Sequence, residues 1–284
     1  MAAYDLAIQN FAVAEHLLQL YELFHGLKEE TAIEDLRLVV CRKWGIPETT
    51  CIRNACNDRM FLVSRATAPI PPALLIENGA DFLLRQAVVV SCTALESFFW
   101  DSLRENVLTI VRARRRGADE SLRDLKLTLD DYLSLENYSD QDERLKQIIL
   151  KNFERGTLYD TGSIEKIASI LTVREFWDSV ARQCGSSSRD IRRNLDELIQ
   201  RRNQITHRAD RPNPEADPPE EQDVHGLRAI NFAWVNARVS MAKSVVNASH
   251  ECFHQAMQRL EQQLVMEREQ ELARKTLEGG ASES

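Results

Sequence analysis

Two side chains that can act on a phosphodiester lie close together in the stretch Arg202-Asn203-x-x-x-His207. An imidazole titrates near neutral pH and can move a proton, while a guanidinium stabilises negative charge on non-bridging phosphate oxygens. Asn203 and His207 are four residues apart, so they share one face of a helix. RNA supplies its own nucleophile, the 2′-hydroxyl, so this set of side chains requires no metal. The pattern predicts chemistry on RNA.

The surroundings of Arg202 strengthen this prediction. In the helix expected over about 189–207, apolar side chains recur at helical spacing, at Ile191, Leu195, Leu198 and Ile205. Arg202 falls near the middle of this apolar stripe, and burying its charge is costly unless a partner or a ligand compensates. The alternative is a side chain that bends out to solvent at the helix end. We expect Arg202 to meet an anion beside His207.

Glu96 is the second charge in an unusual place. It is the only charged residue between Ala87 and Trp100. A carboxylate in apolar surroundings needs a partner, or its pKa rises. We expect Glu96 to pair with Arg202 and to orient it. The alternative places Glu96 on the solvent side of its helix.

Charge is unevenly distributed along the chain. The net charge of −8 excludes a protein that coats nucleic acid over its whole surface, yet 182–211 holds eight arginines against four acidic residues. Arginine suits bidentate phosphate contacts, so we expect RNA to contact Arg193, Arg201 and Arg208. Genomic bias toward arginine is the alternative explanation. The basic run 112–116 either guides RNA or complements a helix C-terminus.

Helical periodicity dominates, so the predicted fold is all-α, a helical bundle. We expect helices over about 4–27, 31–44, 81–112, 143–153, 172–184, 189–207 and from 227 to beyond 264. Thr172 with Glu175 has capping-box spacing, and Ser186 to Ser188 offer N-caps. Prolines predict a linker at 66–72 and an exposed loop at 209–223. No convincing strand pair is visible.

The remaining composition limits the cellular setting. The longest apolar stretch, 87–100, is too short to span a bilayer, and the first twenty residues do not resemble a signal peptide. No C-x-x-C pair occurs among Cys41, Cys51, Cys56, Cys92, Cys184 and Cys252. Buried free thiols in a reducing compartment are therefore expected. We expect a cytoplasmic protein with no membrane contact, no metal and no cofactor.

The motif and the earlier helix Ala94-Leu95-Glu96-Ser97-Phe98-Phe99 together resemble HEPN domains, over roughly 76–264. These are helical bundles with an Arg, four to six residues, then a His. The closest branch is the bacterial ribonuclease-like group of defence and toxin–antitoxin systems. The resemblance implies a homodimer whose two motifs face each other, and RNA cleavage that leaves a cyclic phosphate. It gives catalytic roles to Arg202 and His207, with Asn203 as the polar member and Glu96 on the earlier helix.

The resemblance also divides the chain. Residues 76–265 form the HEPN-like domain, 1–75 an extra N-terminal helical region of unknown role, and 266–284 the end of the last helix and a disordered tail. A regulatory or antitoxin partner is implied as well. One variant of the family carries a tyrosine two residues after the His that a partner nucleotidyltransferase modifies. Ala209 stands there in this chain, which argues against that kind of partner.

Two other functions compete. His250-Glu251-Cys252-Phe253-His254 spells H-E-x-x-H, the pattern of zinc metalloproteases. Phe253 belongs to the apolar stripe of the last helix, and no third-ligand helix or substrate-aligning strand is evident. The other alternative is a HEPN-like module that binds RNA or a protein without cleaving.

Overall fold

The structure is a computed structural model with two compact units. Unit 1 comprises Met1–Ile8, Ala94–Ile199 and Met241–Ser284, and unit 2 comprises Gln9–Thr93 and Gln200–Ser240. Each unit is described by itself below. The structure describes residues 2–24, 41–43, 45, 51–55, 60–64, 79–113, 128–153, 160–216, 218–223 and 225–280.

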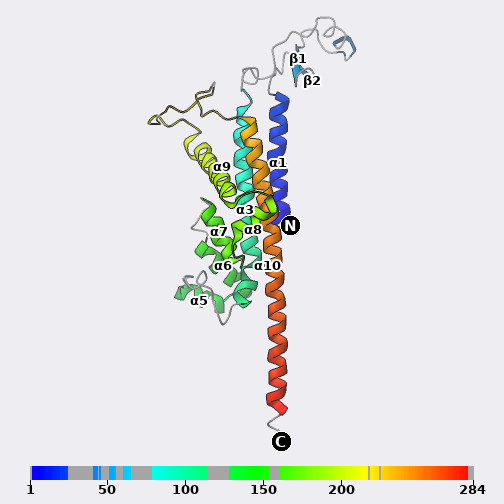
Figure 1. The fold of residues 1–284 in the computed structure, drawn as a ribbon, viewed down its shortest axis with the longest axis vertical. Helices are drawn as coiled ribbons and strands as arrows, with labels where there is room; N and C mark the ends of the chain where they lie inside the picture. Colours follow the sequence, from blue (N-terminus) through cyan, green and yellow to red (C-terminus); the bar gives the residue numbers. More distant parts are fainter. Residues whose placement is uncertain are drawn as a thin grey trace. The chain divides into compact units, whose positions relative to one another are not determined.

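Helices make up most of the described chain, so the predicted all-α class is confirmed (Figure 1). They are α1 (Ala3–Phe24), α3 (Asp81–Ala113), α5 (Leu129–Glu136), α6 (Gln141–Phe153), α7 (Thr161–Ile170), α8 (Phe176–Cys184), α9 (Ser188–Arg208) and α10 (Phe232–Gly280). The helix ends agree closely with the prediction for α1, α3 and α9. The last helix starts later than predicted, because Asn231 caps it by accepting a bond from the Trp234 N–H at 2.8 Å.

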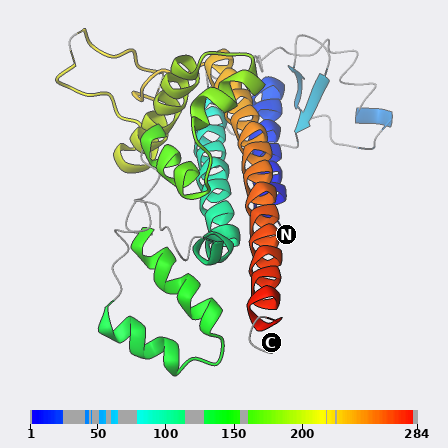
Figure 2. The ribbon, with the colours of Figure 1, turned by 60° about the horizontal axis from the view of Figure 1, so that its bottom comes forward.

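Unit 1 is built around an aromatic core. Phe98 and Phe99 of α3, Phe176 of α8 and Phe253 of α10 are buried, and their ring centroids lie 5.1–6.1 Å apart. Offset and edge-to-face contacts of this kind add to the burial of the rings. The core fixes α8 against α3 and α10. Separately, α5 and α6 lie side by side as a helical hairpin (Figure 2).

Unit 2 joins the end of α1 to the starts of α3 and α10. The Tyr21 ring stacks on Phe232 at 5.7 Å. Its hydroxyl forms a hydrogen bond with the buried Asp81 carboxylate, and burial together with that carboxylate raises the pKa of Tyr21 to about 12. Apolar side chains of the three helices complete the core, among them Phe11, Leu84 and Val235.

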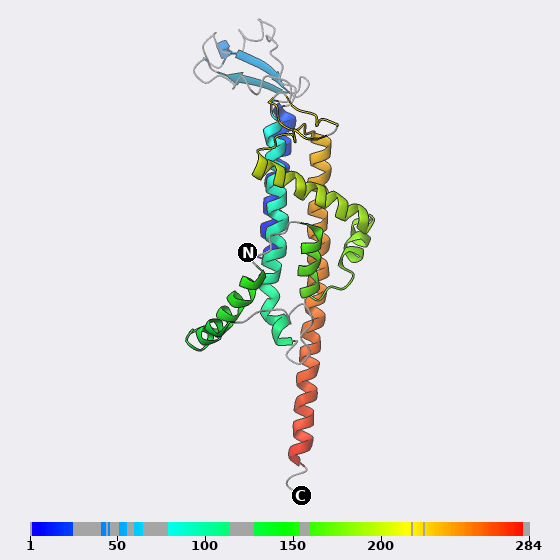
Figure 3. The ribbon, with the colours of Figure 1, turned by 90° about the vertical axis from the view of Figure 1, so that its left-hand side faces the viewer.

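The prediction that no strands occur is wrong for one segment. β1 (Cys51–Ala55) and β2 (Met60–Ser64) pair antiparallel, with Ile52 opposite Val63 (Figure 3). The extra N-terminal region is therefore not purely helical. Of the helix expected over 31–44, only the helical residues 41–43 are described. The predicted linker at 66–72 and Arg114 to Gly117 lie outside the described residues.

Other local predictions also needed correction. The capping box of Thr172 and Glu175 is not formed: Glu175 is itself the N-cap residue of α8, and its side chain makes no capping hydrogen bond. Two short helices, α5 and α7, were not predicted, although Thr128 with Asp131 forms a capping box and Asp160 caps α7. α10 continues to Gly280, beyond the point where the sequence predicted a disordered tail.

One described helix passes a length and composition test for membrane spans. α3 has 33 residues, and its most apolar window has a mean hydropathy of 1.4, but 61% of that window is buried inside the protein. Burial of this extent is typical of the core helix of a soluble protein.

Candidate active site

The helix that carries the predicted motif, α9, has a clear start and a clear stop. The Ser187 hydroxyl caps it by accepting from the Asp190 N–H at 3.0 Å. Ile191, Leu195 and Leu198 are buried, as the apolar stripe predicts. The helix ends where Ala209 and Asp210 take the left-handed values φ 49° and 56°. This reversal turns the chain back directly after the motif.

The reversal brings the Asp210 side chain into the interior of unit 2, where it meets two arginines. Asp210 Oδ2 accepts from Arg85 Nε at 2.6 Å and from Arg201 Nη2 at 3.0 Å. Only 1% of the Asp210 side chain is exposed, against 9% for Arg85 and 13% for Arg201. Burial lowers the pKa of Arg201, and Asp210 opposes that shift. A buried carboxylate therefore ties the residue before Arg202 to the turn after His207.

Arg85 also binds the proline-rich loop that follows α9. Arg85 Nη2 donates to Asp223 Oδ2 at 2.6 Å and to the Arg228 carbonyl at 2.9 Å. Burial alone would raise the pKa of Asp223, but bonds from the Leu227 N–H and from Arg85 outweigh it and lower that pKa. The loop was expected to be simply exposed, and this is wrong for Asp210 and Asp223. We call Arg85, Arg201, Asp210 and Asp223 the Arg85 network.

The three motif residues follow one another along the last turns of α9. Arg202 is half-buried, Asn203 is half-buried and His207 is exposed. The Asn203 Oδ1 atom is buried without a hydrogen-bond partner among the described residues. The Arg202 carbonyl accepts from the Thr206 hydroxyl at 3.0 Å. The last two turns of α9 thus carry an exposed imidazole, a partly buried guanidinium and a buried amide oxygen.

The other predicted site residues have different surroundings. Glu96 is half-buried on α3; it belongs to unit 1 and Arg202 to unit 2, so their pairing stays a prediction. Arg208 is exposed. Arg193 is largely exposed, and its charge is balanced by Asp190 at 2.9 Å and Glu197 at 4.0 Å. Arg201 donates to Asp210 and to two backbone carbonyls, which leaves it poorly placed for RNA.

The H-E-x-x-H pattern lies on α10, with both histidines exposed. His250 stacks on Tyr4 at 4.2 Å between ring centroids, and Glu251 accepts from Gln255 at 2.7 Å. Phe253 is part of the aromatic core, as the sequence indicated. Among the described residues no group of three His, Cys, Asp or Glu side chains could hold a metal ion. The pattern therefore gains no third ligand from the described fold.

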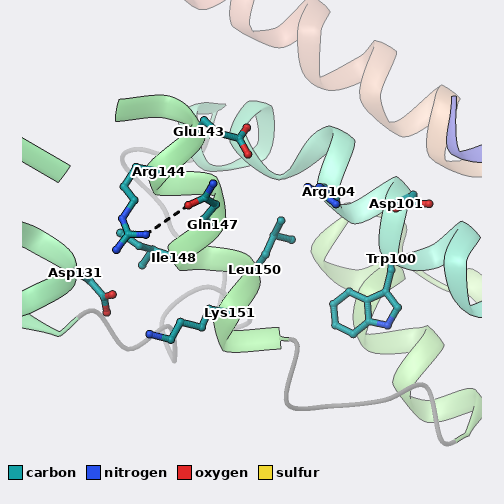
Figure 4. A pocket seen from close by; sticks show the side chains of 10 residues that line it. All are labelled: Trp100, Asp101, Arg104, Asp131, Glu143, Arg144, Gln147, Ile148, Leu150 and Lys151. Atoms are coloured by element: carbon teal, nitrogen blue, oxygen red, sulfur yellow. Dashed lines mark hydrogen bonds between the residues drawn. The ribbon is translucent and has the colours of Figure 1, made fainter. Parts of the chain in front are cut away.

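A cleft of about 480 Å³ lies between α3, α5 and α6 (Figure 4). Its lining contains three basic and three acidic residues: Arg104, Arg144 and Lys151 with Asp101, Asp131 and Glu143. Asp131 is committed to the capping box of α5, and Arg144 donates to Ser134 at 2.9 Å. This balance of charge gives the cleft no preference for an anion.

A helical bundle that carries an arginine and a histidine at the end of one helix, here Arg202 and His207, is the arrangement of the HEPN class. The chain belongs to the RiboL-PSP-HEPN family, whose model matches residues 62–233, more than half of the chain. The matched range includes the whole motif and the Arg85 network. Membership indicates an RNase-like or RNA-related function. No curated protein and no solved structure matches this chain.

Proposed function

We propose that this protein is a metal-independent endoribonuclease that cleaves RNA by attack of the 2′-hydroxyl on the adjacent phosphorus. The observation that carries the proposal is the Arg202-Asn203-x-x-x-His207 motif, which lies at the end of α9 inside the matched family region. His207 is exposed, so a substrate can reach its imidazole.

The roles of the side chains follow from their chemistry. The 2′-oxygen loses its proton and forms a bond to phosphorus, the bond from phosphorus to the 5′-oxygen breaks, the 5′-oxygen takes up a proton, and a 2′,3′-cyclic phosphate remains. His207 moves a proton in this exchange, because an imidazole can both accept and donate a proton. Arg202 stabilises the negative charge that gathers on the non-bridging oxygens. Asn203 supplies a polar contact, and Glu96 orients Arg202.

The wider setting belongs to the proposal as well. The active form is a homodimer in which two motifs face each other, located in the cytoplasm. Cleavage serves antiviral defence or a toxin–antitoxin pair, under the control of a regulatory or antitoxin partner. Arg208 and Arg193 contact the RNA backbone. Arg201, which the sequence predicted to contact RNA, instead takes part in the Arg85 network.

The chemistry of the substrate tests the proposal. Purified full-length protein is incubated in EDTA with an RNA oligonucleotide and with the same sequence fully 2′-O-methylated. We expect only the unmodified RNA to be cut, and the upstream product to end in a 2′,3′-cyclic phosphate. Cleavage of the methylated strand, or loss of cleavage in EDTA, contradicts the mechanism.

The second candidate is a HEPN-like module that binds RNA or protein without cleaving it. The unpartnered, buried Asn203 Oδ1 favours a contact with a ligand in either case. A binding module leaves the RNA uncut, and His207→Ala does not change its affinity for the ligand.

A further inference from the structure

A second cleft, wholly within unit 1, has a different charge from the one between α3, α5 and α6. It has a volume of about 540 Å³ and lies between the 171–175 turn, α8 and α10. Three arginines line it, Arg174, Arg182 and Arg259, and no acidic residue does. On a chain with a net charge of −8, a hollow lined only by cations and neutral groups attracts anions.

None of the three arginines is paired with a carboxylate among the described residues, although an adjoining cleft that shares two of them also contains two glutamates. Arg174 and Arg259 are exposed, and neither forms an ion pair within the part of the chain that the structure describes. Among the described residues, Arg182 donates to the Asp178 carbonyl and to the Ser179 hydroxyl, both at 3.3 Å. Guanidinium groups without a carboxylate partner keep their donors for an outside anion.

The floor of the cleft is neutral and firmly packed. Gln183 Nε2 donates to Cys252 Sγ at 3.4 Å and so ties α8 to α10. Burial raises the pKa of the Cys252 thiol, which therefore brings no negative charge to the cleft. Phe253, the residue after Cys252, stacks on Phe176 with 5.9 Å between ring centroids.

The turn that carries Arg174 has an uncommon backbone. The residues two before it and one after it, Thr172 and Glu175, take φ 68° and 49°. Left-handed conformations are unfavourable for residues with a Cβ and persist where surrounding structure enforces them, often at functional sites. Here the N–H groups of Leu171 and Val173 donate back into α7 at 2.9 and 3.0 Å. The turn thereby holds Arg174 at the mouth of the cleft.

We propose that this arginine cleft binds the phosphodiester backbone of single-stranded RNA, as a substrate-holding subsite separate from the Arg202–His207 motif. The inference rests on the proposed RNA-directed function. Arginines lining a groove follow the backbone phosphates without reading the bases. RNA held here stays near the rest of the molecule, which raises the effective concentration of RNA at the reacting site.

The test measures binding of a fluorescein-labelled oligouridylate to full-length His207→Ala protein by anisotropy over a range of salt. The cleft variant adds Arg174→Ala and Arg259→Ala, and the control adds Arg189→Ala and Arg268→Ala, two exposed arginines outside the cleft. Both changes alter the net charge equally. We expect the cleft variant to bind on the order of tenfold more weakly. The slope of log affinity against log salt concentration should become less steep by about 1.4, since each lost phosphate contact removes about 0.7 from that slope. The control should change little.

Three results overturn the inference: equal weakening in both variants, no RNA binding by the parent protein, or uridine monophosphate binding as tightly as the oligomer. Cleavage kinetics on a wild-type background separate this site from catalysis. The cleft variant should raise KM and leave kcat unchanged. If the cleft variant cleaves RNA with an unchanged KM, the result contradicts the proposed RNA-binding cleft and leaves the endoribonuclease proposal standing. Arginine-dependent binding without any cleavage contradicts only the endoribonuclease proposal.

Discussion

Arg201 and Arg202 are neighbours in the sequence, yet they have different surroundings. Arg201 is tied to Asp210 and to backbone carbonyls, while Arg202 is half-buried one position closer to His207. The apolar stripe alone pointed to Arg202, because helical spacing places it among Leu195 and Leu198. The same reasoning could not separate a phosphate-binding arginine from a structural one next to it.

Substitution of Arg202 tests its charge-stabilising role. Arg202→Ala should lower kcat by roughly 10²- to 10³-fold, the usual effect of removing one donor to a developing negative charge. Arg202→Lys should recover only part of this loss, because an ammonium lacks the planar fork. Rates are measured under single-turnover conditions, with the exposed Arg211→Ala as the matched control. A rate for Arg202→Ala equal to that of the control would remove Arg202 from the mechanism.

Tyr21 predicts how stability depends on pH. Its pKa is raised from 10.0 to about 12 in the folded protein, so the unfolded chain ionises first as the pH rises. The free energy of unfolding should therefore be insensitive to Tyr21 below about pH 10 and should fall between pH 10 and 12. Denaturant titrations across this window should show a smaller fall for Tyr21→Phe than for wild type. Identical slopes would mean that the buried hydroxyl does not carry the effect.

At the scale of elements, the Arg85 network is the contact that sequence patterns could not reveal. Arg85 lies 125 residues before Asp210 and 138 residues before Asp223, so both ends of the loop are held by a helix far away in the sequence. Local signals did predict the cap Ser187, the buried face of α9 and the end of the preceding helix at residue 184. Local patterns encode caps and faces, whereas partners of buried charges depend on tertiary packing.

The errors have physical causes of the same kind. Thr172 and Glu175 have the spacing of a capping box, but the chain is left-handed at both residues, which prevents the reciprocal bonds. The helices α5 and α7 were missed because, at 8 and 10 residues, they are too short for a clear helical period; their N-termini are fixed by Thr128 and Asp160. The strand pair of 51–55 with 60–64 lies in a segment without clear alternation.

The network should stabilise the protein far more than a surface ion pair. Asp210→Asn leaves two buried guanidinium groups without their shared carboxylate, and breaking a buried pair costs about 3–5 kcal/mol. The matched control is Arg112→Ala, which removes the exposed Arg112–Asp142 pair and should change stability little. Both are measured by denaturant unfolding. A loss for Asp210→Asn as small as that of the control would show that the network is not a structural anchor.

The network should also affect catalysis, because it brackets the motif from both ends. Arg85→Lys keeps the charge and loses the second donor group that reaches Asp223 and Arg228. We expect a protein that folds but has a lower kcat at unchanged KM, since a shifted motif impairs the reaction more than binding. A raised KM with a normal kcat would contradict a positioning role.

At the scale of the whole molecule, the proposed active form needs two copies of the motif. Sedimentation equilibrium should therefore give twice the chain mass of 32.5 kDa at concentrations where RNA is cleaved. Specific activity should fall on dilution below the dissociation constant of the dimer. Full activity in a monomeric protein would contradict the two-motif arrangement and leave a single Arg202–His207 set as the reacting centre.

The most direct test of the central claim compares two exposed histidines, one at the end of α9 and one in the loop that follows it. His207→Ala removes the proposed proton carrier, and His225→Ala removes an exposed imidazole while keeping the backbone bond of residue 225 to Asp223. RNA cleavage is measured for both in EDTA. We predict that His207→Ala loses at least about 10²-fold in rate and that His225→Ala cleaves like wild type. Equal rates for the two variants would contradict the assignment of His207, and with it the proposed mechanism.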